Sequence, residues 1–245
     1  MLELTQSKQN APLQLEGFKV IKRPPQFKKL IVLILDAVNP RQNGEIYFPE
    51  IQKGVNEAMN DYLVAMKANP SSANYGLRIN TLSKATHEVL IQSELDAVPD
   101  DQELFSTLHH RAPMALADGL ELAQKQALAF LNNKQTPHLV HTAQLIFVSF
   151  GNYYPSEITI ELAKAIQNHP RLALYTAYFA PEQYDPEVSS KTSEIRARTF
   201  RFLSKINAPF AAVGLPVCRT PKTLTQFLLD VSLIPKIDRT SCKTN

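Results

Sequence analysis

Ten residues in three short segments could do chemistry, because each segment lies beside the expected end of a buried strand or start of a helix. They combine a carboxylate, two imidazoles, two guanidinium groups, two amides and three aromatic rings. Such groups could exchange protons, hold an ion or anchor a protein partner. The candidates are Asp36, Asn39, Arg41, His109, His110, Arg111, Phe150, Asn152, Tyr153 and Tyr154.

Other reactive side chains lack the partners that catalysis or metal binding would need. His138 and His141 stand at an i,i+3 spacing beside a proline, which is only a fragment of a zinc site. Cys218 has no positioned base in the sequence and is expected to be a small buried hydrophobe, with a nucleophile as the alternative. Residues 149–151 read Ser-Phe-Gly and do not match the GxSxG turn of α/β-hydrolases. No catalytic residue is therefore assigned.

The composition restricts both the fold and the ligands. The chain has 245 residues, and its 44% hydrophobic fraction is enough to bury a core and exclude global disorder. Only 7 residues are glycine, about 3% against a usual share of roughly 7%. Neither GxGxxG nor GxxxxGKS/T occurs, so nucleotide loops of the Rossmann or P-loop kind lose their main support.

The net charge of +3 is concentrated at the two ends of the chain. Residues 1–29 carry six basic and two acidic side chains, and residues 236–245 carry three basic and one acidic. Solubilising ends explain this pattern. Nucleic-acid binding is disfavoured, because no long arginine run or interleaved aromatic residues accompany it. Glu94, Asp96 and Asp100-Asp101 are interpreted as a solvated loop face.

The sequence favours a cytoplasmic location. The polar start Met1–Asn10 is unlike a signal peptide, and the longest apolar run is Leu30–Leu35. A membrane-spanning helix would need roughly 20 apolar residues. Two cysteines without CxxC spacing suit a reducing compartment. We therefore expect a soluble protein without membrane contact.

Strand and helix patterns alternate along the chain. Continuous β-branched and leucine runs indicate strands covered on both faces, and apolar residues three and four apart indicate helices with one buried stripe. The expected strands are Lys29–Asp36, Tyr75–Leu82, His87–Gln92, Gln144–Phe150, Leu172–Phe179 and Phe210–Val213. The expected helices are Pro49–Asn69, Pro113–Asn132, Ser156–Asn168, Thr192–Ile206 and one that opens at Thr220-Pro221. This order predicts an α/β fold with a doubly wound, mostly parallel sheet flanked by helices, as in Rossmann-like folds.

The chain divides into one domain and two short ends. Residues 28–235 form the predicted domain, residues 1–27 an N-terminal extension and residues 236–245 a C-terminal tail. Within the extension, Leu13–Ile21 alternates apolar and polar residues and could pair as an edge strand, separated from the domain by Pro24-Pro25.

Three segments in order carry a resemblance to a known family. They read LILDAVNP, APMALADGLELAQ and LIFVSFGNYYPSE, and a closing helix–strand–helix stretch from Phe202 follows them. In this order the chain resembles a von Willebrand factor type A (vWA) domain, most closely the bacterial TerY-like group of tellurium-resistance proteins. The resemblance covers about 85% of the chain, from about residue 28 to 235. It implies the same Rossmann-like fold and a Mg²⁺ or Mn²⁺ adhesion site at the strand ends.

Transferring that metal site residue by residue removes most of its ligands. The family's strand-end aspartate matches Asp36, but its two serines fall on Val38 and Pro40, its threonine on or beside Met114, and its second aspartate on Phe150. Mg²⁺ needs oxygen ligands in nearly octahedral geometry, so a single carboxylate cannot hold it tightly. We expect a degenerate site without metal or cofactor.

Asp36 then needs another source of neutralisation if it is buried. Arg41, one of the candidate histidines, Arg111 or water could supply it, or Asp36 could cap the turn that follows through its side chain. The resemblance implies a non-enzymatic scaffold that binds protein partners in a bacterial stress-response or signalling system. The interaction loops would be Asp36–Gly44, Leu108–Met114 and Phe150–Pro155. The alternative is an α/β enzyme acting on a small molecule at the same edge.

Overall fold

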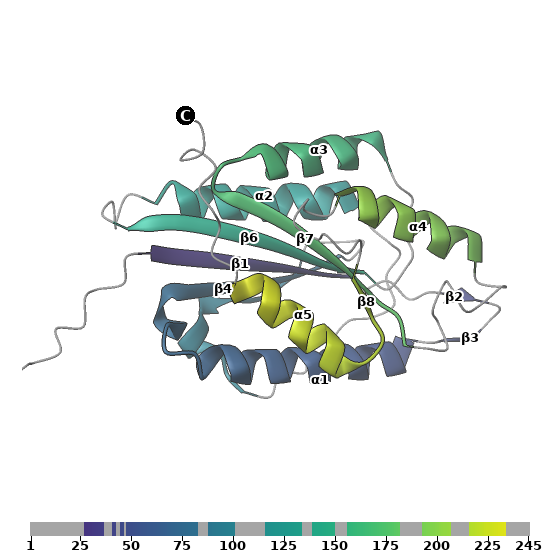
Figure 1. Cartoon of the computed structure of the whole chain (residues 1–245), viewed down its shortest axis with the longest axis horizontal. Coiled ribbons are helices and arrows are strands. Elements are labelled where there is room, and N and C mark those ends of the chain that lie inside the picture. The colour runs from purple at the N-terminus through teal and green to yellow at the C-terminus, as the bar shows by residue number, and fades with distance from the viewer. Residues whose placement is uncertain are drawn as a thin grey trace, which may run out of the picture.

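The fold is a single six-stranded sheet with helices on both faces, together with a two-stranded ribbon (Figure 1). The computed structural model describes residues 27–36, 41–42, 45–46, 48–82, 88–100, 116–133, 139–149, 156–181, 193–206 and 216–233. The strand order is β5-β4-β1-β6-β7-β8, and β5 alone pairs antiparallel to its neighbour in this sheet. The strands of the sheet are β1 (Phe27–Asp36), β4 (Tyr75–Leu82), β5 (Glu88–Glu94), β6 (Val140–Ser149), β7 (Leu172–Phe179) and β8 (Val217–Cys218).

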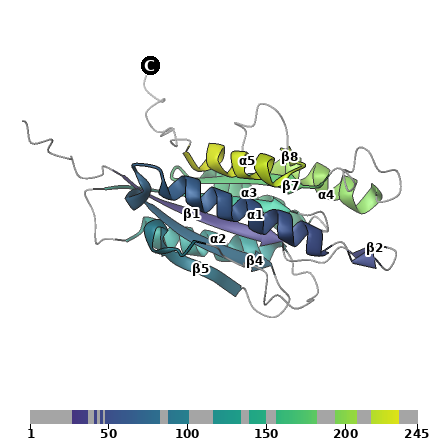
Figure 2. The ribbon, with the colours of Figure 1, turned by 90° about the horizontal axis from the view of Figure 1, so that it is seen from below.

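Two layers of helices cover the sheet. Figures 1 and 2 show α1 (Phe48–Lys67) and α5 (Pro221–Leu233) together on one face. The other face carries α2 (Leu116–Leu131), α3 (Glu157–Asn168) and α4 (Ser193–Ile206). Two short 3-10 helices, η1 (Ser72–Asn74) and η2 (Leu95–Ala97), flank β4 and β5. No helix in these parts of the chain is long and apolar enough to span a bilayer.

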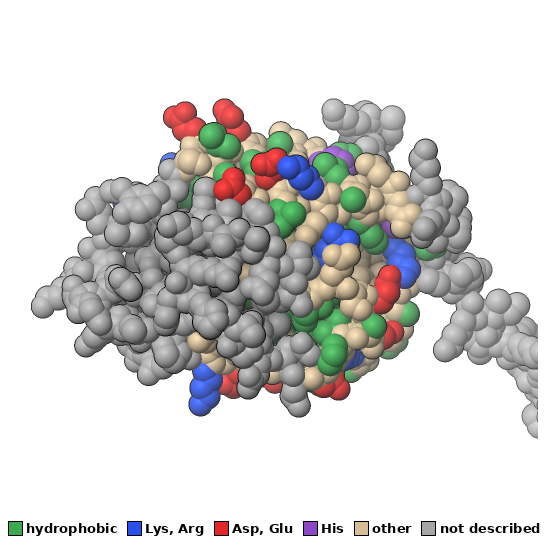
Figure 3. All heavy atoms as spheres, turned by 180° about the vertical axis from the view of Figure 1, so that it is seen from behind, with side chains coloured by type: hydrophobic (Ala, Val, Ile, Leu, Met, Phe, Trp, Pro, Cys, Tyr) green, Lys and Arg blue, Asp and Glu red, His purple; other side chains and the backbone are tan. Residues whose placement is uncertain are grey.

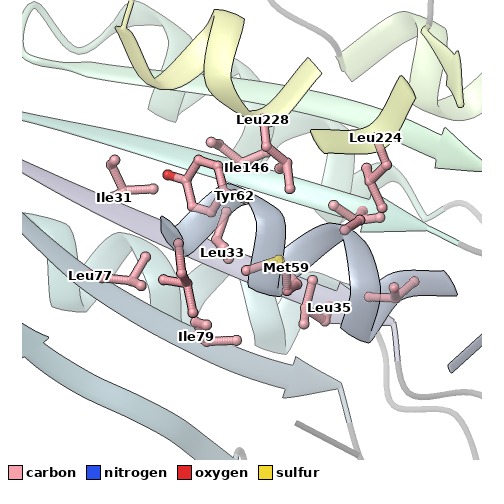
Figure 4. Packing of buried hydrophobic residues seen from close by; sticks show 14 of the residues in the cluster. Ile31, Leu33, Leu35, Met59, Tyr62, Leu77, Ile79, Ile146, Leu224 and Leu228 are labelled. Atoms are coloured by element: carbon pink, nitrogen blue, oxygen red, sulfur yellow. The ribbon is translucent and has the colours of Figure 1, made fainter. Parts of the chain in front are cut away.

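The central strand β1 supplies both halves of the core. Ile31, Leu33 and Leu35 pack toward α1 and α5, while the alternate residues between them pack toward α2 (Figure 4). Because successive side chains of a strand point to opposite faces, a run of apolar residues is what a strand covered on both sides requires. Full burial of each such side chain contributes roughly 1.5–3 kcal/mol.

Helix α1 docks through the apolar stripe expected from its sequence. Val55, Met59, Tyr62 and Met66 are all buried against the sheet or α5. On the side toward α5, Gly54 leaves no room for a larger residue: a Cβ atom there would lie 2.9 Å from the Phe179 ring. The glycine therefore allows a close approach between α1 and β7.

The predicted fold class is confirmed, and most elements lie where the sequence placed them. The predicted strand Phe210–Val213 lies outside the described residues, as does the possible edge strand Leu13–Ile21. The described sixth strand is β8, a two-residue bridge to β7 that the sequence did not reveal. The ribbon of β2 (Arg41–Gln42) and β3 (Glu45–Ile46) was likewise not predicted, because elements this short carry no periodic pattern.

Candidate functional site

The carboxyl ends of the four long parallel strands meet at one edge of the sheet. Asp36 at the end of β1 pairs with Leu82 of β4, and the preceding Leu35 pairs with Val148 of β6. Ser149, the last residue of β6, is level with Tyr178 of β7. Ligands of open α/β sheets bind beyond this edge. The three candidate segments were predicted to gather there, and we call it the carboxyl edge.

The structure describes only two of the ten predicted site residues, and only their backbones. Asp36 closes β1, and Arg41 lies in β2 opposite Ile46. The side chains of these two residues lie outside the described part. So do the eight remaining candidates, which are Asn39, His109, His110, Arg111, Phe150, Asn152, Tyr153 and Tyr154. The predicted gathering of these side chains stays a prediction.

Two capped helix starts lie at the carboxyl edge. Ser156 caps α3, where its Oγ accepts a hydrogen bond of 3.2 Å from the Thr159 amide. Thr220 caps α5 in the same way, accepting from the Thr223 amide at 3.2 Å. A cap of this kind satisfies an otherwise free amide and fixes where the helix begins. The loop before α3 is therefore anchored at its end.

One exposed apolar residue stands on that anchored turn. Ile158, in the first turn of α3, keeps 68% of its surface exposed. It lies just after the predicted interaction segment Phe150–Pro155. The sequence did carry a signal for it, because Ile158 falls off the stripe formed by Ala163 and Ile166, which are buried. An apolar side chain on the outer side of an amphipathic helix has no role in the core.

Polar groups are buried just inside the carboxyl edge. Asn80 of β4 and Gln126 of α2 form a reciprocal amide pair, with Nδ2 to Oε1 at 2.8 Å and Nε2 to Oδ1 at 3.3 Å. Thr81, the neighbour of Leu35, is fully buried, and its Oγ1 has no hydrogen-bond partner among the described residues. The sequence predicted neither the Asn80–Gln126 pair nor the buried Thr81 hydroxyl, since a polar residue within an apolar strand does not indicate which distant residue it contacts.

The side chains with reactive chemistry are not assembled for catalysis in the described parts of the chain. Cys218 is buried, and burial raises the pKa of its thiol to about 12, which keeps it protonated. His141 is buried with its ring 5.2 Å from that of Phe130, edge to face. No group of three or more metal-ligating side chains occurs among the residues described. Glu94 and Asp100 are exposed, as predicted, and pair with lysines.

A buried polar cluster lies at the opposite, amino end of β1. The ammonium of Lys29 donates to the carbonyl of Ser232 at 2.8 Å and lies 5.8 Å from the centre of the Tyr75 ring. The hydroxyls of Tyr62 and Ser232 are 2.8 Å apart. Burial lowers the pKa of Lys29 to about 8 and raises that of Tyr62, although the hydrogen bond with Ser232 opposes the latter. A cation at the last turn of α5 complements the helix dipole there.

Charged side chains of both signs lie on the face of the molecule seen in Figure 3. The face in Figure 3 shows acidic and basic side chains between apolar and neutral ones, and no continuous basic stripe among the residues it colours. One pair, Glu121 and Lys125 on α2, forms an i,i+4 ion pair of 2.7 Å. A nucleic-acid surface would instead gather its basic residues on one face.

Comparison with known proteins yields matches of fold only. No family model matches the chain, and no curated protein sequence matches it. Among solved structures, 84% of the chain superposes on the pilus adhesin SpaC of Lactobacillus rhamnosus GG with a TM-score of 0.57 and 10% identity. The same share superposes on proximal thread matrix protein 1 of the mussel byssus (TM-score 0.54, 9% identity). It also superposes on a von Willebrand factor type A structure from Catenulispora acidiphila (TM-score 0.51, 11% identity).

The chain has a von Willebrand factor type A fold. It spans less than half the length of these structures: 30% of SpaC, 48% of the byssus protein and 42% of the Catenulispora chain. At such identities the vWA likeness concerns the backbone. It carries over neither ligands nor partners.

Proposed function

We propose that this vWA-like domain is a non-enzymatic module that binds protein partners through the carboxyl edge of its sheet. Its contacts are apolar, aromatic and charged side chains rather than a bridging cation. The finer assignment, a scaffold in the cytoplasm of a bacterium serving stress response or signalling, rests on the sequence resemblance to the TerY-like group. An interaction role suits the fold, since domains of this architecture commonly mediate protein contacts.

The observation that carries the proposal is the exposed Ile158. Its side chain stands on a capped and therefore fixed helix turn, and the predicted anchors Tyr153 and Tyr154 precede it in the chain. An apolar residue that follows two tyrosines in the sequence fits the composition of an interface centre, where desolvated anchors contribute most of the affinity. A rigid support lowers the ordering cost of binding.

The test replaces these anchors and compares them with a matched exposed residue elsewhere. Val64 of α1 is 58% exposed on a helix and lies away from the carboxyl edge. Affinity capture compares the unmodified chain with the Tyr153→Ala/Tyr154→Ala chain and the Ile158→Ser chain. A partner captured by the unmodified chain should be lost by both variants. Val64→Ser should retain it. If all four baits capture the same proteins equally, the carboxyl edge is not the contact surface.

Independence from metal forms a separate part of the proposal. Of the five positions that would hold the family's cation, Val38, Pro40, Met114 and Phe150 offer no hard oxygen from their side chains. This donor set does not fit Mg²⁺ or Mn²⁺. A ligand that binds only the folded state raises its stability, so thermal unfolding should be unchanged by millimolar amounts of either ion. A clear rise in Tm with Mg²⁺ or Mn²⁺ would overturn this part of the proposal.

A further inference from the structure

The outer edge of β5 is the open side of the sheet that lies nearest to the start of β1. β5 is a seven-residue strand paired on one side with β4, and no other described strand pairs with its outer side. An open edge of this length exposes a row of backbone donors and acceptors, which proteins commonly cover. We propose that residues 13–21 of this same chain cover it as a seventh strand.

The start of β1 lies close to the end of β5. Lys28, the second residue of β1, reaches across β4 and forms a 3.3 Å ion pair with Glu94, the last residue of β5. The Phe27 ring also packs edge to face against Tyr75 of β4, 6.1 Å between centres. Both contacts point from the start of β1 toward β4 and β5, as Figure 2 shows for the strands themselves.

The connecting residues are long enough for this edge. A position beyond β5 lies three strand spacings from β1, roughly 14 Å. Residue 21 and Phe27 are six Cα–Cα steps apart, which can span about 20 Å when extended. The opposite edge, beyond β8, lies four spacings away at roughly 19 Å, at the limit of this reach, and β8 offers only two residues to pair with. The length of the strand available for pairing therefore favours β5.

The alternating sequence of the segment suits an edge strand at this place. Leu13 and Leu15 alternate with polar residues, and after Gly17 the alternation resumes with Phe18 and Val20. A glycine at such a change of phase is typical of a β-bulge. The β4–β5 pair has an irregularity of its own, between Ile79 and Asn80.

Opposite charges meet at the proposed contact. Residues 88–101 carry five acidic and no basic side chains, which are Glu88, Glu94, Asp96, Asp100 and Asp101. The segment and its connection carry Lys19, Lys22 and Arg23 against Glu16. Because the segment ends where β1 begins, it would run in the same direction as β5, giving a parallel pair. Glu94 and Asp100 already pair with Lys28 and Lys67, and the remaining acidic charge favours pairing of the basic segment with this edge.

Amide hydrogen exchange, followed by mass spectrometry, tests the pairing in the full-length chain. Proline lacks the amide hydrogen and is excluded from paired strands. Successive amides of a strand point to opposite sides, so the double variant Lys19→Pro/Val20→Pro removes the one that faces β5 whichever it is. The matched control is Gln9→Pro/Asn10→Pro, outside the segment. Peptides from β1, at the centre of the sheet, report whether the fold is intact.

We expect the β5 amides not bonded to β4 to exchange at least tenfold faster in the Lys19→Pro/Val20→Pro chain, with β1 unchanged. The Gln9→Pro/Asn10→Pro chain should behave as the unmodified one. Equal exchange of β5 in all three chains would overturn the proposal. So would protection that falls on dilution, because the covering strand would then come from a second copy. The Lys19→Cys/Gln92→Cys chain, with Cys242→Ser, should also form a disulfide within one chain.

Discussion

Lys29 offers the sharpest quantitative prediction, because a lysine buried to 4% exposure must lose most of its hydration. Its ammonium donates a hydrogen bond of 2.8 Å to the Ser232 carbonyl and faces the Tyr75 ring. Burial is the cause of its lowered pKa. The substitution is Lys29→Met, which keeps the unbranched side chain up to its last atom and removes the charge. Lys29→Arg is the matched control, since arginine stays charged throughout the accessible pH range.

The sign and size follow from proton linkage. The pKa of Lys29 falls from 10.5 to about 8 on folding, so between these values the unfolded chain binds more protons than the folded one. The free energy of unfolding therefore rises with pH across this window. At 1.36 kcal/mol per pH unit, the total amounts to about 3 kcal/mol. Roughly 1 kcal/mol of it appears between pH 7 and pH 9.

Urea unfolding at a series of pH values measures this directly. The chain has no tryptophan, so far-UV circular dichroism is the appropriate signal. The stability of the unmodified chain minus that of Lys29→Met should rise by about 1 kcal/mol from pH 7 to pH 9. The difference between Lys29→Arg and Lys29→Met should stay constant. If the unmodified chain and Lys29→Met follow parallel curves, Lys29 keeps its ordinary pKa and the reasoning is refuted.

Three further predictions test the packing of the sheet. Gly54→Ala should destabilise by about 1–2 kcal/mol in urea unfolding, because the clash with Phe179 outweighs a gain in helix propensity of about 1 kcal/mol; a more stable variant would show that the ring yields. Gln126→Leu should cost about 1–3 kcal/mol by leaving the buried Asn80 amide unpaired, and Asn80→Leu/Gln126→Leu should recover part of it. Cys218 should resist iodoacetamide at pH 8 in the folded chain and react in urea, as mass spectrometry would show; rapid native labelling would contradict its burial.

The sheet could be predicted because its strands are buried on both faces. A run such as Leu30–Leu35 leaves no polar residue for solvent, and a β-branched and leucine run of this length is typical of a strand at the centre of an α/β sheet. The apolar residues of α1 recur three and four positions apart, and this repeated spacing predicts a helix with one buried face in the same way. The two-residue β8 carries none, since its position depends on pairing with the end of β7 rather than on its own composition. Periodicity identifies long elements and misses those held only by a neighbour.

The buried polar groups escaped prediction for a different physical reason. Lys29 opens an apolar run, and the sequence contains nothing that links it to Ser232, more than two hundred positions later. The same holds for Asn80 and Gln126, whose partnership exists only after β4 and α2 have packed. A polar residue in a core is meaningful only with its partner, and the partner is a property of the fold.

The same distinction explains why the vWA fold is traceable at 9–11% identity while the site is not. Core positions of β1 and β6 require only apolar side chains of suitable volume, so many sequences satisfy them and the backbone persists. Loops at the carboxyl edge are under no such packing constraint, so the residue at each position there can change with the ligand that is bound. Function in this chain must accordingly be tested at Ile158 and at the predicted anchors Tyr153 and Tyr154, because the same core would support either a metal-binding or a metal-free edge.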